Sequence, residues 1–210
     1  MVRKLTLLML LMLPLFAVSA IAAPVTVTGN TTGVFGAGSS SGVVSNGGST
    51  ITFGSTVVNF SSLSNEINVA LNPGEFSNVT LGIFNSTSTG LSSVNGATFT
   101  LSISFSAPSN LTPNPQTFTA TLTGTISTGA SGAQVNWNQQ TLTFTSPTAG
   151  TFTLTIEPST PINAPSSPSA SRIRGVLTYA SAPVPEPATL LLLGTGLGGV
   201  AWRMRRRKKD

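Results

Sequence analysis

The chain has 210 residues, a net charge of +5, and neither cysteine nor histidine. Eight of the ten lysines and arginines lie in the two end segments, and the body between Ala23 and Pro183 carries two arginines and three glutamates, a net charge of −1. This distribution excludes a nucleic-acid surface, which needs clustered cations, and the missing residue types exclude disulfides, Ser-His-Asp triads and most metal sites.

Residues 1–22 have the three parts of a secretory signal peptide. Arg3 and Lys4 form a positive start, Leu5–Val18 is mostly apolar, and Ala20-Ile21-Ala22 has the small-x-small pattern of a cleavage site. We therefore predict a signal helix, export through the Sec pathway and cleavage before Ala23. An uncleaved anchor helix is the alternative.

The next part of the chain is predicted to begin irregularly and then form strands. Residues 29–48 are rich in glycine and serine and predict a long loop or an irregular edge. Strands are expected at residues 50–60, 67–71 and 75–84, where apolar and polar residues mix with β-branched types.

From Ala97 onward apolar and hydroxyl residues alternate, as in strands that bury one face. Runs of this kind begin near Phe99, Phe118, Leu142 and Phe152, and a last strand is expected at residues 172–179. Eight to ten strands separated by turn residues predict one domain, residues 23–180, with an antiparallel β-sandwich fold. A jelly roll is one form that this sandwich could take.

The body offers little for catalysis. Its acidic residues are Glu66, Glu75 and Glu157, and none has a nucleophile or base as a visible partner. We therefore expect a protein that is not an enzyme and that needs no cofactor and no metal.

Trp137 is the candidate for a sugar contact in the body. It lies among the amides of Gln134-Val135-Asn136-Trp137-Asn138-Gln139-Gln140, and an indole flanked by amides suits a sugar-binding surface. Val135 and Trp137 share one face, however, and tryptophan is also a common core residue of β-sandwiches. The core is the favoured interpretation.

The end of the chain has the composition of a membrane segment. A Pro-rich tether at residues 181–187 leads into an uncharged, mostly apolar run at residues 188–202. As a transmembrane helix this run spans about 22 Å, less than the hydrocarbon core of about 30 Å. A basic cytoplasmic tail, residues 203–210, would then stop translocation. Its cations are Arg203, Arg205, Arg206, Arg207, Lys208 and Lys209.

Pro185-Glu186-Pro187, the Leu- and Gly-rich span and the terminal basic cluster together resemble the PEP-CTERM sorting signal. The resemblance covers residues 184–210 and does not extend to the body. It implies recognition by an exosortase, a membrane-embedded processing enzyme of Gram-negative bacteria. It further implies that the inner membrane holds the precursor until the tail is removed, and that the body reaches the outer surface or an exopolysaccharide matrix.

These observations predict a surface or extracellular-matrix structural protein, such as one of a biofilm, with the exosortase and the membrane as partners. Two alternatives remain. The body could be an exopolysaccharide-binding module, or the chain could be a membrane-anchored periplasmic protein whose tail is retained.

Overall fold

The computed structural model describes residues 23–63, 67–181 and 196, and within them the chain is all-β, with antiparallel strand pairs throughout. The six-stranded sheet, in the order β14-β11-β9-β8-β1-β5, consists of Ser159–Ile162, Ala133–Trp137, Gln116–Thr123, Thr98–Ala107, Val25–Gly36 and Ile67–Leu71. The seven-stranded sheet, in the order β12-β13-β15-β6-β4-β3-β2, consists of Thr141–Ser146, Gly150–Ile156, Ser171–Ser181, Phe76–Ser88, Thr56–Ser61, Thr50–Phe53 and Val43–Ser45. A small sheet pairs β10 (Thr125–Ile126) with β7 (Ser92–Ser93), and η2 (Asn46–Gly48) is a 3-10 turn.

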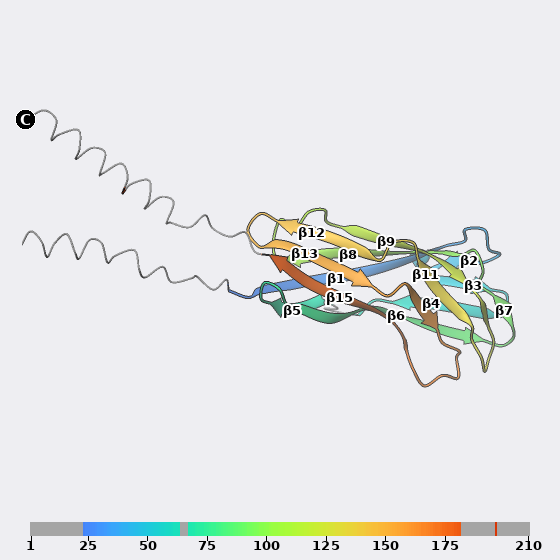
Figure 1. Cartoon of the computed structure of the whole chain (residues 1–210). Helices are drawn as coiled ribbons and strands as arrows, with labels where there is room; N and C mark the ends of the chain where they lie inside the picture. The colour runs from blue at the N-terminus through green and yellow to red at the C-terminus, as the bar shows by residue number, and fades with distance from the viewer. Residues whose placement is uncertain (1–22, 64–66, 182–195, 197–210) are drawn as a thin grey trace, which may run out of the picture.

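The two large sheets pack face to face, and their strands run along the long direction of the body (Figure 1). Phe99 of the six-stranded sheet contacts Phe84 and Phe60 of the seven-stranded sheet, with ring centroids 4.9 and 5.2 Å apart. Phe105 and Phe144 meet across the sheets with centroids 4.5 Å apart. Each buried ring contributes about 1.5–3 kcal/mol of hydrophobic stabilisation. The all-β, antiparallel prediction is confirmed, and the arrangement is sandwich-like.

The alternating runs form strands with the predicted faces. In β8 the side chains of Phe99, Leu101 and Ile103 are buried, and the serines and threonines between them are more exposed.

The structure differs from the predictions in one strand and in the possible jelly roll. The segment 50–60 is a hairpin of β3 and β4 that turns at residues 54–55, and the six- and seven-stranded sheets formed by the described residues exceed the eight strands of a jelly roll.

The prediction of a loop over residues 29–48 is wrong for its first part. Residues 25–36 form β1, a twelve-residue strand that pairs with β8 on one side and β5 on the other. Its inward positions include Gly29, Thr31 and Gly33, so it lacks the apolar alternation that marks the other strands. Glycine is required at residue 33, because an added Cβ would lie 2.5 Å from ring atoms of both Phe60 and Phe99.

The strand β14 is a second element that the sequence pattern does not predict. β14 lies in the proline-containing segment 158–168, which the sequence predicts as a break between strands. It is one of the two edge strands of the six-stranded sheet in the described chain and contains Pro161, which is tolerated at an edge because one side of the strand needs no donor.

The first and last strands of the body meet at one end of the sandwich, at the left in Figure 1. Val25 at the start of β1 pairs with Leu71, and the loop that follows Leu71 reaches the end of β15. There the Gly74 amide donates to the Tyr179 carbonyl at 2.7 Å, and the Tyr179 amide donates to the Glu75 carbonyl at 2.9 Å. The β5–β6 loop thus joins both ends of the folded body.

The signal helix at residues 1–22 and the transmembrane helix at residues 188–202 lie outside the described residues, except for Gly196. Within the described part of the chain, no helix has the length and apolar character needed to cross a membrane.

Candidate functional site

The chain leaves the fold through β15, which lies between β13 and β6 in the interior of the seven-stranded sheet. The strand ends at Ser181, where it still pairs with Thr151. Pro185 follows Ser181 by four residues in the sequence. The sorting residues Pro185, Glu186 and Pro187 and the basic residues 203–209 lie outside the described residues.

The loop beside this exit is held by one carboxylate. Glu75 Oε2 accepts hydrogen bonds from the backbone amide of Asn72 at 2.8 Å and from Asn72 Nδ2 at 3.1 Å. These bonds favour the ionised carboxylate and lower the pKa of Glu75, the backbone bond having the larger effect. Glu75 therefore has a structural task in the turn. Glu157 follows β13, and Glu66 lies outside the described residues.

Trp137 is buried, with 5% of its surface exposed. Its indole Nε1 donates to Thr160 Oγ1 at 3.1 Å, and its ring makes edge contacts with Phe99 and Phe118 at centroid distances of 6.0 and 6.2 Å. Val135 on the same face has no exposed surface. The interpretation of Trp137 as a core residue is confirmed, and its ring offers no open face on which a sugar could stack.

A groove on the outer face of the seven-stranded sheet has no counterpart among the predicted site residues. It has a volume of about 460 Å³ and crosses the three strands β13, β15 and β6. The side chains of the groove residues form two cross-strand rows, because Val176 pairs with Thr155 and Asn78 while Arg174 pairs with Thr80. We define the groove residues as Asn78, Thr80, Thr155, Glu157, Arg174 and Val176.

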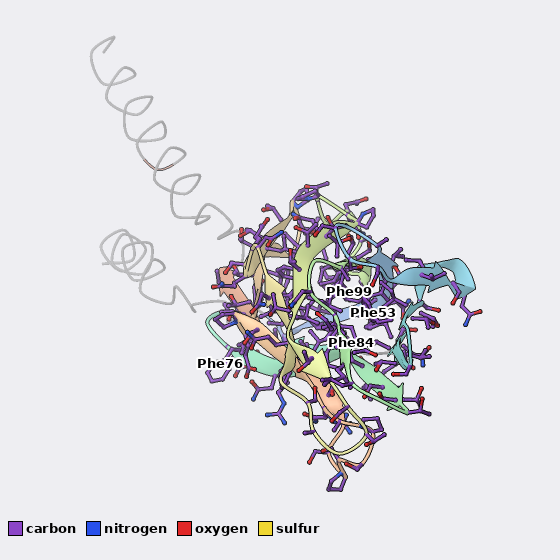
Figure 2. All side chains as sticks on the ribbon, turned by 90° about the vertical axis from the view of Figure 1, so that its right-hand side faces the viewer. Phe53, Phe76, Phe84 and Phe99 are labelled. Atoms are coloured by element: carbon purple, nitrogen blue, oxygen red, sulfur yellow. The ribbon has the colours of Figure 1, made fainter. Side chains whose placement is uncertain are left out.

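Phe76 lies one row beyond this groove, where it pairs with Thr178. Its side chain is 68% exposed and projects from the surface, whereas Phe53, Phe84 and Phe99 lie inside the body (Figure 2). Phe76 lies in the strand expected at residues 75–84, where the sequence pattern does not distinguish it from the buried apolar residues. The available signal was its register: it shares the even, outward positions of β6 with Asn78 and Thr80.

A comparison with protein families matches residues 183–207 to the PEP-CTERM protein-sorting motif. No curated protein and no solved structure matches the chain. The family match includes Pro185, Glu186 and Pro187 and extends through Arg207. The chain therefore carries a PEP-CTERM protein-sorting motif at residues 183–207, directly after a β-rich body.

Proposed function

We propose that this protein is a non-enzymatic structural protein of the cell surface or extracellular matrix, delivered there after an exosortase removes its tail. The observation that carries the proposal is the PEP-CTERM motif at residues 183–207, which supports exosortase-dependent sorting of a surface protein. The signal-peptide pattern of residues 1–22 agrees with it, because a sorting signal of this kind acts on an exported chain.

The position of β15 suits processing at the membrane. The folded body ends at Ser181, so the sorting motif follows the fold without a long spacer. An enzyme embedded in the membrane can then reach the motif while the body stays folded. Pro185 and Pro187 support this, because each ring fixes φ near −65° and removes a backbone donor, and the residues before them favour extended backbone.

The apolar run and the basic tail complete the proposed signal. Residues 188–202 would hold the precursor in the inner membrane, and the cations that begin at Arg203 would resist translocation. This segment is short for a permanent membrane helix, which agrees with a temporary anchor.

The surface of the body supports a structural role. Outward positions of β8 and β9 are mostly serine and threonine, and the two arginines and three glutamates are the only charged residues between Ala23 and Pro183. Such a surface stays hydrated without carrying the clustered acids and bases that catalysis needs.

The test is replacement of Pro185, Glu186 and Pro187 by alanine in the native host. We expect export and folding to continue while a longer, membrane-bound precursor accumulates, measured by intact mass and membrane fractionation. The control replaces Pro165 and Pro168, two exposed prolines of the β14–β15 loop, and should leave processing unchanged.

Two outcomes would contradict the proposal. If wild type and the triple variant both retain Asp210 and differ in mass only by the three substitutions, the tail is a permanent anchor and the protein is a membrane-anchored periplasmic protein. If the control blocks processing as strongly as the triple variant, the effect comes from proline loss in general and not from the motif.

A further inference from the structure

The groove on the seven-stranded sheet combines side chains that individually bind parts of a sugar chain. Arg174 and Glu157 are both exposed and lie opposite each other on β15 and just after β13. Ile156 pairs with Gly175, so the antiparallel register places Glu157 opposite Arg174. Among the described residues, neither side chain forms a hydrogen bond or an ion pair, so both are available to a ligand. The amide of Asn78 and the hydroxyl of Thr80 lie on the adjacent strand.

The groove is open and elongated rather than enclosed. Its two rows and the row of Phe76 extend roughly 14 Å along β6 and about 10 Å across three strands. Val176 forms a half-buried apolar floor in the middle. This shape suits a chain lying on the surface, whereas a small metabolite is usually surrounded on most sides.

Phe76 supplies the apolar contact that polar groups alone cannot provide. The Phe76 ring has 68% of its surface exposed, so a ligand can reach it, and the C–H face of a pyranose ring is a suitable partner. Phe76 lies two residues before Asn78 on the same strand face, about 7 Å away. A sugar stacked on the ring would therefore have its neighbour over the groove.

The charges indicate which sugar chain fits. Arg172 and Arg174 are the only cations between Ala23 and Pro183, and both are exposed on the outer face of β15. A guanidinium forms paired hydrogen bonds with a carboxylate, and a carboxylate such as Glu157 accepts hydrogen bonds from sugar hydroxyls. A peptide fits less well, because β15 is an interior strand whose backbone groups are already used by β13 and β6.

We propose that this groove, together with Phe76, binds an acidic polysaccharide that carries carboxylate groups. Phe76 stacks on one sugar ring, Arg174 pairs with a carboxylate, and Asn78 and Glu157 bind hydroxyl groups. This inference rests on the proposed surface location, because only there would the body meet a polysaccharide. It places the sugar contact on the outer face of the seven-stranded sheet and away from Trp137.

The experiment measures retention of the full-length protein, in detergent, on gels containing alginate as the carboxylated polysaccharide or dextran as the neutral one. Phe76→Ala and Arg174→Gln should each weaken alginate binding about tenfold, the effect of losing one stacking contact or one charged hydrogen bond. Dextran should bind much more weakly than alginate. Melting temperatures of the variants should match wild type, because both residues are exposed.

Two matched controls separate the groove from general effects. Leu91→Ala truncates an apolar residue that is 75% exposed outside the groove, and Arg172→Gln removes the same charge from the same strand. Both should stay within about twofold of wild type. Every protein of the series carries glutamine in place of the six cations of residues 203–209, so that alginate retention reports the body and not the tail.

Equal losses for Arg172→Gln and Arg174→Gln would overturn the proposal in favour of diffuse charge attraction. Unchanged binding by Phe76→Ala would overturn it as well. If Phe76→Ala loses binding to vesicles of anionic phospholipid while alginate binding is kept, the ring contacts a membrane instead. The proposed sorting is tested separately, because the variant lacking Pro185, Glu186 and Pro187 keeps the groove and should still bind alginate.

Discussion

Trp137 lies where rings of the core meet, and its polar atom is satisfied inside the protein. The Nε1–H group donates to Thr160 on the neighbouring edge strand β14, so the indole links an edge strand to the centre of the sheet. Thr160 is itself buried, with 3% of its surface exposed. The amides around Trp137 in the sequence point away from this environment, which is why the local sequence suggests a more polar setting than the residue has.

Trp137→Ala should lower the free energy of unfolding by about 3–5 kcal/mol, because it removes a large buried side chain and leaves a cavity. Urea unfolding measures this change. Asn138→Ala, at the exposed neighbouring position, is the control and should have little effect. A Trp137→Ala protein that keeps its stability but loses polysaccharide binding would show that the indole is a sugar platform.

Tyr179 is the one tyrosine of the chain, and burial raises its pKa above the ordinary value of 10.0. Its ring stacks on Phe152 with centroids 4.6 Å apart, and 1% of its surface is exposed. Below about pH 10 the phenol is neutral in both the folded and the unfolded chain. Above that pH the unfolded chain ionises first, so the free energy of unfolding should fall as the pH rises.

Absorbance of the phenolate band reports Tyr179 alone, and it should titrate at higher pH in the native protein than in urea. Tyr179→Phe should remove this alkaline loss of stability. The same titration midpoint in both states would contradict the expected burial effect.

Among the elements, β12 shows how an edge strand is kept from pairing with another chain. Thr145 exchanges backbone hydrogen bonds with Thr112, at 2.8 and 2.9 Å. The carbonyls of Thr143 and Thr141 accept from the side-chain amides of Gln116 and Gln139. These groups occupy the backbone positions that a neighbouring strand would otherwise use, so the uncharged edge is protected without lysine or proline.

The strand β6 contains a bulge that shapes the core. Its register with β15 shifts between Arg172 and Arg174, where β6 has one residue more than β15. Gly82 lies in this bulge and has a φ of 138°. An added Cβ at Gly82 would lie 2.3 Å from Phe60 Cε2, and one at Gly33 would lie 2.5 Å from Phe60 Cδ1. Glycines on both sheets therefore make room for the Phe60 ring, and the bulge increases the local twist.

Gly33→Ala should lower the free energy of unfolding by about 1–3 kcal/mol, because the added methyl group overpacks the contact of Phe60 with Phe99. Gly132→Ala is the control. Nothing lies within 4 Å of a Cβ at Gly132, so its stability should stay the same or rise slightly. Thermal unfolding compares the two, and equal losses would indicate a general glycine effect rather than crowding.

At the scale of the whole molecule, both ends of the body lie at one end of the sandwich, beside the β5–β6 loop (Figure 1). The strand that leads to the sorting motif is also an interior strand of the seven-stranded sheet. The last strand of the fold and the sorting motif are therefore adjacent in the sequence, but removal of the tail need not disturb the fold. The cut must leave β15 complete if the released body is to stay folded.

A chain that ends at Ser181 should retain a cooperative unfolding transition and a β-type far-UV spectrum. A chain that ends at Ala170 lacks β15, so β13 and β6 lose their shared neighbour and the core residues Ile173, Leu177 and Tyr179. It should lack the cooperative transition. A processed protein whose intact mass shows an end before Ser181 would contradict this requirement.

Much of the strand content could be predicted because burial of one sheet face leaves a period of two in the sequence. That pattern was clear in β8, β9 and β13, where large apolar residues occupy the inward positions. β1 was not predicted because glycine and threonine occupy several of its inward positions. Large side chains such as Phe60 of the facing sheet fill that part of the core instead. β14 escaped because proline, a turn signal in most contexts, is also compatible with an edge.

The sequence by itself determined the sorting motif and the all-β class, because these depend on residues close together in the chain. Only the tertiary structure decided that Trp137 is buried and that Phe76 stands beside a groove. The residues of that groove lie between positions 78 and 176 in the sequence and belong to three strands. The pattern within one strand does not indicate which distant strand it pairs with, or in which register. Local pattern specifies which face of a strand is buried, and long-range register specifies which side chains become neighbours.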